Sequence, residues 1–164
     1  MCRKVPQWCV LKAGRPIQGS ILQEEQLIGD LGELIAAYEL RRWFILLRYI
    51  KITPTGSRQD AYPVLIPVHT GANRLLKDRL KRLTEQQKEY LCKLRPLWDF
   101  IGFPYSFKIG ESSPHLIEVK TSIRRRFKET RRDVSREKEL GFHVLNVIVD
   151  LSSLPAYRLT IKEL

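Results

Sequence analysis

The sequence is poor in cysteine and histidine, with three residues of each among 164. The cysteines are Cys2, Cys9 and Cys92, an odd and sparse set that argues against a disulfide framework and for reduced thiols. A centre held by four thiolates would need one more cysteine, and the nearest histidine, His69, is isolated. These shortages argue against a structural zinc or iron–sulfur centre.

Long apolar runs, internal repeats and low-complexity tracts are also missing. No apolar run approaches the roughly 20 residues that cross a bilayer, and the first residues, which include Pro6, lack a signal-peptide core. The 43% of hydrophobic residues is typical of a folded protein, and the length fits one domain spanning residues 1–164. We therefore expect a single domain in the cytoplasm, with no membrane partner.

The net charge of +11 comes from two segments. Residues 74–95 hold eight basic and three acidic side chains, and residues 120–138 hold nine basic and three acidic ones. Basic residues recur every four positions in the second segment, so on a helix they would form one cationic stripe suited to a phosphate backbone. The residues expected to contact nucleic acid are Arg74, Lys81, Arg124, Lys128, Arg132 and Arg136. The alternative is that both segments are ordinary solvated helix faces.

Hydrophobic spacing and chain breakers predict the order of helices and strands. Helices are expected over residues 23–43, 73–95 and 125–140. Strands are expected near 8–11 and over 44–53, 62–68 (an edge strand), 98–109, 115–122, 142–151 and 157–161. The strands at 98–109 and 115–122 should pair, and 142–151 should be a buried central strand. This order predicts an α/β sheet with helices on its faces.

The run Leu116-Ile117-Glu118-Val119-Lys120 holds the strongest candidate for chemistry. Alternate side chains of a strand share a face, so Glu118 and Lys120 should point one way and their neighbours toward the core. Asp99 is a charged residue in an apolar segment, and it would converge with Glu118 on one cation if the two segments pair. Ligation by oxygen alone favours Mg²⁺ or Mn²⁺.

These residues resemble a known signature. Asp99 with Phe100-Ile101-Gly102, followed 19 residues later by Glu118-Val119-Lys120-Thr121, is similar to the Asp, Glu-x-Lys motif of the PD-(D/E)XK nuclease superfamily. The segment Gly29-Asp30-Leu31-Gly32-Glu33-Leu34-Ile35-Ala36-Ala37 looks like its first helix, where many members, including archaeal Holliday-junction resolvases, carry an active-site glutamate. The resemblance covers roughly residues 23–53 and 97–151, with 54–96 as an insertion. Trp98 replaces the proline of the name.

The resemblance implies a restriction-endonuclease-like mixed central sheet flanked by helices, with an inserted basic helix. It assigns Asp99, Glu118 and the carbonyl of Val119 as metal ligands. Lys120 would orient or activate the attacking water, and Glu33 would assist through the metal or its water. Small residues one turn from Glu33 on its helix face leave room for close approach to a strand; these are Gly29, Ala36 and Ala37.

The implied function is Mg²⁺- or Mn²⁺-dependent hydrolysis of phosphodiester bonds in DNA, by an endonuclease of repair, recombination or defence. Two alternatives stay open: a non-catalytic nucleic-acid-binding module on the same fold, and an RNA-processing nuclease. A homodimer would suit symmetric cutting of two strands. Other polar and aromatic residues are expected to be structural: His115 and His143 as strand or surface residues, and Trp8, Trp43 and Trp98 in the core.

Overall fold

The computed structural model describes residues 2–4, 21–52, 62–68, 73–93, 98–105, 113–124 and 132–164. The strands are β1 (Cys2–Lys4), β2 (Phe44–Ile52), β3 (Tyr62–Pro67), β4 (Phe100–Pro104), β5 (His115–Ser122), β6 (His143–Ser153) and β7 (Ala156–Glu163). The helices are α2 (Ile21–Leu40), α3 (Asn73–Lys81), α4 (Glu85–Lys93) and α5 (Ser135–Glu139). The strand predicted near residues 8–11, with Trp8, lies outside the described residues.

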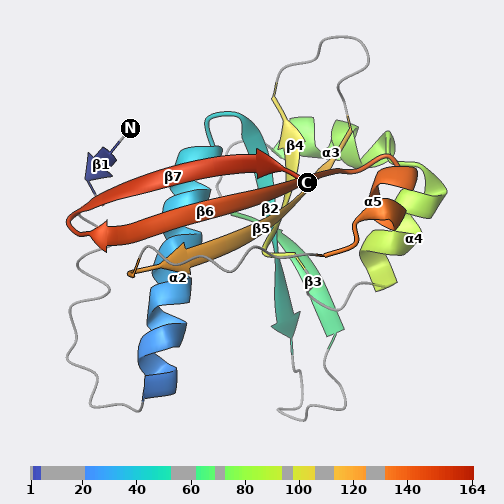
Figure 1. Cartoon of the computed structure of the whole chain (residues 1–164). Helices are drawn as coiled ribbons and strands as arrows, with labels where there is room; N and C mark the ends of the chain where they lie inside the picture. Colours follow the sequence, from blue (N-terminus) through green and yellow to red (C-terminus); the bar gives the residue numbers. More distant parts are fainter. Residues whose placement is uncertain are drawn as a thin grey trace.

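All seven strands form one mixed sheet in the order β1-β7-β6-β5-β4-β2-β3 (Figure 1). The β5–β6 pair is parallel, and the other neighbouring strands are antiparallel. The predicted pairing of β4 with β5 is confirmed. So is the edge position of β3, whose Pro63 and Pro67 each lack a backbone donor.

Helices cover both faces of the sheet. The helix α2 packs through Ile35, Ala36 and Leu40 on one face, against residues of β2, β4, β5, β6 and β7. On the other face, side chains such as Leu76 of α3 and Leu91 of α4 pack against a second apolar cluster. The predicted architecture, a mixed α/β sheet flanked by helices, is therefore confirmed.

The sequence explains why β5 and β6 lie inside the sheet. Both strands bury apolar side chains on both of their faces, as a central strand must. On β6, Val144 contacts the cluster under α3 and α4, while Val147 and Val149 contact the cluster under α2. The prediction that the segment from residue 142 onward is a buried central strand is confirmed.

The predicted helix over residues 73–95 is wrong in one respect, because the chain forms two helices there. A capping box starts α4: the backbone N–H of Gln87 donates to Thr84 Oγ1 at 3.1 Å, and the backbone N–H of Thr84 donates to Gln87 Oε1 at 3.1 Å. The Gln87 side-chain amide also donates to the carbonyl of Leu140 at 2.9 Å. These bonds start a new helix at Glu85 and fix α4 beside α5.

The second predicted helix, over residues 125–140, is not continuous in the described part of the chain. Residues 132–134 are not helical, α5 covers only Ser135–Glu139, and residues 125–131 lie outside the described part of the chain. The strand predicted over 98–109 is also shorter, since β4 starts at Phe100 and ends at Pro104. Its predicted end, residues 106–109, is not among the described residues.

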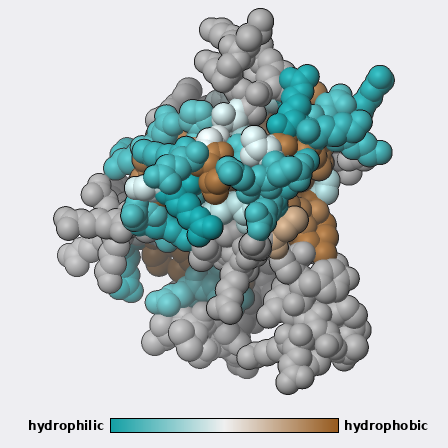
Figure 2. Space-filling model, turned by 90° about the vertical axis from the view of Figure 1, so that its right-hand side faces the viewer, coloured by the Kyte–Doolittle hydropathy of each residue, from teal (hydrophilic) through white to brown (hydrophobic). Residues whose placement is uncertain are grey.

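Hydrophilic side chains dominate the face on which α4 and α5 lie (Figure 2). The sequences of α3 and α4 agree with this view, since most of their residues are charged or amides and few are apolar. Among the described residues, no helix has both the length and the apolar character needed to cross a membrane.

Candidate active site

The short strand β4 creates a fork in the sheet. It pairs with residues 44–47 of β2 on one side and with residues 115–117 of β5 on the other. Both neighbours continue past Phe100, where β2 pairs with β3 and β5 pairs with β6. Residues 48–52 of β2 and 118–122 of β5 therefore diverge (Figure 1), and we call the region between them the fork.

Asp99 lies at the base of the fork. Its backbone N–H donates to the carbonyl of Ile117 at 3.0 Å, and its Oδ2 accepts the backbone N–H of Val119 at 2.6 Å. These two bonds fix both the main chain and the carboxylate of Asp99 on β5. Because the N–H and C=O of one strand residue point toward the same edge, the carbonyl of Val119 also faces the Asp99 side.

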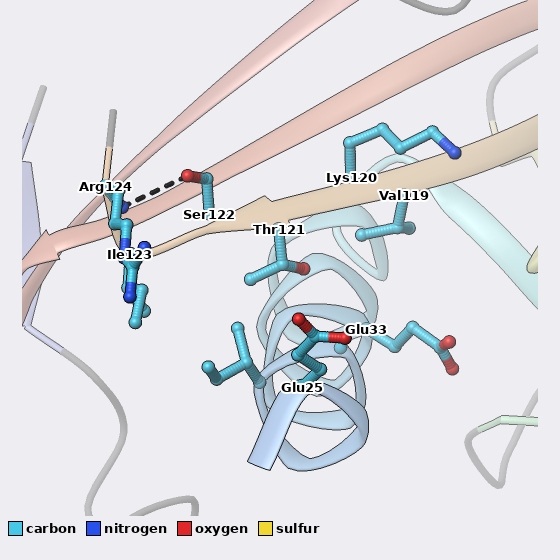
Figure 3. A pocket seen from close by; sticks show the side chains of 10 residues that line it. Glu25, Glu33, Val119, Lys120, Thr121, Ser122, Ile123 and Arg124 are labelled. Carbon is cyan, nitrogen blue, oxygen red and sulfur yellow. Dashed lines mark hydrogen bonds between the residues drawn. The ribbon is translucent and has the colours of Figure 1, made fainter. Parts of the chain in front are cut away.

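Glu118 and Lys120 share one face of β5, as the alternation predicts. The Lys120 ammonium lies 2.7 Å from Glu118 Oε1. Figure 3 shows Lys120 pointing away from α2, whereas Val119 and Thr121 point toward it. Glu118 is only 9% exposed, and its second oxygen, Oε2, is buried without a hydrogen-bond partner. A desolvated carboxylate oxygen in this state is costly unless a cation or donor binds it.

Asn146 lies beside this unpaired oxygen. The parallel register of β5 and β6 places it directly opposite Glu118. Asn146 is 6% exposed, and its Oδ1 is also buried without a hydrogen-bond partner. Two neighbouring side chains thus each hold an unsatisfied oxygen on the same face of the sheet.

Glu33 reaches the fork from the other face of β5, since it belongs to α2. Its Oε2 accepts a hydrogen bond from Arg48 Nη2 at 2.5 Å. Arg48 is the first residue of β2 beyond its pairing with β4, so this ion pair joins α2 to one arm of the fork. In Figure 3, Glu33 points away from Glu25 on the same helix.

The carboxylates of the fork influence one another. Burial raises the pKa of Asp99, and the charge of Glu118 adds to this, while the Val119 N–H, Lys120 and Arg48 oppose it. Burial also raises the pKa of Glu33, where Arg48 opposes the rise and the charge of Asp99 adds to it. Asp99 therefore lies within electrostatic range of both glutamates. The structure brings the four predicted catalytic residues, Glu33, Asp99, Glu118 and Lys120, to one region.

The donor set fits a hard divalent cation with few protein ligands. Among the described residues, no three His, Cys, Asp or Glu side chains form a group that could hold a metal ion. What the fork offers is two carboxylates, Asp99 and Glu118, together with the Val119 carbonyl, whereas Asn146 lies on β6, on the other side of Glu118. Mg²⁺ is commonly held by one or two carboxylates, with waters and substrate phosphates completing its shell. A cation here would also satisfy the orphaned oxygen of Glu118.

The predicted basic stripe is wrong as a continuous helical feature. Arg124 lies in the bend after β5, and Arg132 precedes α5 with its guanidinium 4.4 Å from the centre of the Trp98 ring. Arg136 lies on α5, 5.9 Å from the Tyr90 ring centre. Lys128 is outside the described residues, and Arg74 and Lys81 are exposed on α3. Trp98 itself is 2% exposed, as predicted, whereas Trp43 is 50% exposed, so the predicted place of Trp43 in the core is wrong.

The close approach of α2 to β5 depends on Gly32 rather than on Gly29. A Cβ at Gly32 would lie 1.7 Å from Thr121 Oγ1, whereas a Cβ at Gly29 would meet nothing within 4 Å. The expectation for the two alanines is confirmed, since Ala36 and Ala37 are buried against the sheet. Gly29 instead lines a pocket of about 920 Å³ between α2 and the end of β5, beside Glu33, Lys120 and Arg124 (Figure 3).

Arg48 and Asn146 do not stand out in the sequence. Arg48 lies in a strand with no motif around it. The alternation of side chains along the strand predicts only that Arg48 is exposed, not that it pairs with Glu33. Asn146 interrupts an apolar run, and that isolated polar residue is the one available signal of a special role. The pairing of Asn146 with Glu118 depends on the register of β5 and β6.

Replacing Asp99 with asparagine should stabilise the metal-free protein at pH 7. The pKa of Asp99 is raised in the folded state, so its contribution to stability is full below the pKa of an exposed carboxyl and is lost as the pH rises through the folded value. Asparagine keeps an acceptor for the Val119 N–H without the buried charge. We expect a higher Tm for Asp99→Asn without metal, measured by calorimetry, and a smaller rise in its Tm on adding Mn²⁺.

The control is Glu139→Gln, which changes an exposed carboxylate of α5. It should leave both the metal-free Tm and the effect of Mn²⁺ unchanged. Two results together would contradict this description of Asp99. They are a metal-free Tm of Asp99→Asn below that of the wild type at pH 7, and a rise in its Tm on adding Mn²⁺ as large as that of the wild type.

The charges of the fork define what it can do chemically. Partly buried carboxylates, an orphaned carboxylate oxygen and a lysine ammonium at hydrogen-bonding distance together suit binding of a divalent cation next to a phosphate. No protein-family model, curated protein or solved structure matches the chain.

Proposed function

We propose that this protein is a metal-dependent nuclease that hydrolyses phosphodiester bonds in DNA. It would act as an endonuclease of repair, recombination or defence in the cytoplasm, on a restriction-endonuclease-like fold, with Mg²⁺ or Mn²⁺ as cofactor. The observation that carries the proposal is the buried, unpartnered Oε2 of Glu118, a carboxylate whose Oε1 lies 2.7 Å from the Lys120 ammonium and whose charge acts on Asp99 at the base of the fork.

The acidic residues would hold the cation. Asp99 is fixed by its bonds to β5, and Glu118 has one oxygen left to offer, with the carbonyl of Val119 and Asn146 nearby. When bound, the cation lowers the pKa of a water molecule and stabilises the leaving oxygen. The raised pKa values of Asp99 and Glu33 support this role, because a cation relieves the cost of several buried negative charges.

Lys120 and Glu33 would act from opposite faces of β5. The Lys120 side chain is 41% exposed, so its ammonium could contact a phosphate while it stays paired with Glu118. There it would orient the attacking water and offset the negative charge that builds up on the phosphorus centre. Glu33 is held by Arg48 at the edge of the same region, where it would bind or position water.

Basic side chains around the fork would hold the nucleic acid. Arg124 is exposed at the end of β5 and lines the pocket beside Glu33, so it is placed to contact a phosphate next to the one attacked. Arg132 and Arg136 flank Trp98 and Tyr90 at the α4–α5 side, and Arg74 and Lys81 extend the basic surface along α3. Contacts of this kind position a duplex without reading its sequence.

The direct test offers plasmid, single-stranded and branched DNA, and RNA of matched sequence, with Mg²⁺, with Mn²⁺ and with EDTA. We expect cleavage of DNA that requires metal and is lost in Glu118→Gln. The control is Glu85→Gln, which changes a carboxylate that is exposed on α4 and should leave cleavage unchanged. Cleavage that survives in Glu118→Gln, or in EDTA, would contradict the proposal. Cleavage of RNA alone would reassign the substrate.

A non-catalytic nucleic-acid-binding module is the second candidate, and one observation favours it. Two of the acids are already paired, Glu33 with Arg48 and Glu118 with Lys120, so both carry compensating charges without a cation. Salt-sensitive binding to DNA without hydrolysis, across all metals and substrates, would support this candidate. Sedimentation with and without DNA would show whether a homodimer forms.

A further inference from the structure

A second pocket, of about 480 Å³, lies beside the turn that joins α2 to β2. The strands β2, β5 and β6 begin at this end of the sheet, and β4 and β7 end there. The backbone N–H of Tyr105 donates to the carbonyl of Trp43 at 3.0 Å, which ties the turn to the chain after β4. We call this site the turn pocket.

Aromatic rings form much of the wall of the turn pocket. The imidazoles of His115 and His143 are stacked, with centroids 4.8 Å apart and planes 19° apart. The ring of Phe44 lies 4.8 Å from that of His115, and Trp43 and Tyr105 line the same pocket. Burial, followed by His143, lowers the pKa of His115 to about 4, so this ring is uncharged at pH 7. Walls of this kind suit a flat aromatic ligand.

Trp43 is the side chain that points most clearly to a ligand, because it is 50% exposed. An indole is largely buried in most proteins, and tryptophan in contact with solvent is enriched at binding surfaces. Single-stranded nucleic acids are held by bases that stack on such side chains. A base in the turn pocket would cover part of the exposed surface of Trp43.

The charged groups of the turn pocket suit the polar atoms of a nucleotide. Arg42 lines the pocket and is exposed, with its guanidinium 3.8 Å from the Glu39 carboxylate. Glu163 also lines it, and its hydrogen bond with His143 lowers its pKa, so it is a carboxylate at pH 7. The carbonyl end of α2 repels a phosphate, and Arg42 offsets that repulsion. Because Arg42 and Glu163 cancel in charge, stacking rather than charge would supply most of the affinity.

We propose that the turn pocket binds one unpaired base of single-stranded DNA, stacked on Trp43, with the adjoining phosphate on Arg42. This inference rests on the proposed function in taking nucleic acid as the ligand. A base in a duplex is stacked between its neighbours and paired, so only an unpaired base can enter a pocket.

The turn pocket and the fork lie along the same helix. Glu33, at the fork, is seven residues before Leu40, where α2 ends, or about 10 Å along the helix axis. A strand of a few nucleotides would therefore span both sites. The substrate class that follows is DNA with an unpaired segment near the bond to be cut, rather than a closed duplex.

The test is fluorescence titration of the full-length protein with single-stranded oligothymidylate in EDTA, which prevents cleavage. Stacking of a base on Trp43 should quench its emission, whereas Trp98 is buried and should not respond. Trp43→Phe should lose this quenching but bind a labelled oligonucleotide within about threefold of the wild type, measured by anisotropy. Trp43→Ala should bind the single strand about tenfold more weakly. The same oligonucleotide annealed to its complement should not quench Trp43.

The matched control is Leu154→Ala, which truncates an apolar side chain that is 53% exposed in the turn between β6 and β7. It should leave both the quenching and the affinity unchanged. Glu118→Gln should bind and quench like the wild type, which separates the turn pocket from the fork. Equal affinities of Trp43→Ala and Leu154→Ala for the single strand, or equal quenching by single strand and duplex, would overturn the proposal.

Failure of this inference can be told apart from failure of the proposed function. Quenching of Trp43 by the single strand, without cleavage in any metal, would support the turn pocket and contradict the nuclease alone. Metal-dependent cleavage without quenching would contradict the turn pocket alone. A protein that binds no nucleic acid would overturn both.

Discussion

Replacing Lys120 with methionine should lower the rate of metal-dependent DNA cleavage by about a hundredfold or more while leaving Mn²⁺ binding intact. The Lys120 ammonium lies 2.7 Å from Glu118 Oε1, so it is the positive charge at hand where charge builds up during hydrolysis. It ligates no cation, and its removal takes away a repulsive neighbour of the metal. Single-turnover cleavage and Mn²⁺ titration by calorimetry measure the two effects separately.

Two further variants are compared with Lys120→Met. Glu118→Gln should lose both cleavage and Mn²⁺ binding, because it removes a proposed ligand. Lys88→Met makes the same exchange at a lysine of α4 that is equally exposed and also pairs with a glutamate, Glu85, and it should change neither. If Lys120→Met cleaves at the wild-type rate, the assigned role of Lys120 is wrong. If it loses Mn²⁺ binding together with activity, Lys120 supports the structure of the fork rather than the chemistry.

Replacing Gly32 with alanine should destabilise the protein by about 1–3 kcal/mol, although alanine is the better helix former. The new Cβ would lie 1.7 Å from Oγ1 and 2.7 Å from Cβ of Thr121, so α2 and β5 must move apart. Glu33 is the next residue, and the shift would move it relative to the fork. Denaturant unfolding measures the loss, and the cleavage assay should show reduced activity in the folded variant.

The matched control lies one turn earlier on the same helix. A Cβ at Gly29 meets nothing within 4 Å, so Gly29→Ala should gain up to about 1 kcal/mol from helix propensity. The double variant Gly32→Ala/Thr121→Ala should lose less free energy of unfolding than the two single variants lose in total. The reason is that alanine at position 121 removes the oxygen that makes the closest contact with the new Cβ. Equal stability of Gly32→Ala and Gly29→Ala would show that the helix and strand are not in contact at Gly32.

Strands were predictable from the sequence where burial decides their limits. The segment 115–122 coincides with β5, and the segment 44–53 nearly coincides with β2, because both are continuous runs of strand-forming residues closed by polar or turn residues. Basic helices were less predictable. The break at Thr84 depends on two reciprocal hydrogen bonds, and α5 begins only at Ser135, so regular spacing of charges did not indicate regular structure.

The candidate site was predictable to the extent that its residues lie in neighbouring segments. Glu118 and Lys120 share a face through strand alternation, and Asp99 joins them because β4 and β5 pair. Arg48, Asn146 and the pairing of His115 with His143 depend on the register of strands far apart in the chain. No local pattern encodes a parallel register, since it is set by packing against α2 and against the helices of the other face.

The most direct test of a divalent cation at the fork is anomalous diffraction from a crystal soaked in Mn²⁺. The proposed function predicts one strong peak within about 2.5 Å of a carboxylate oxygen of Asp99 and of Oε2 of Glu118, with Lys120 beside it but outside the coordination sphere. A fork without such a peak at saturating Mn²⁺, with the Glu118–Lys120 pair undisturbed, would contradict the account.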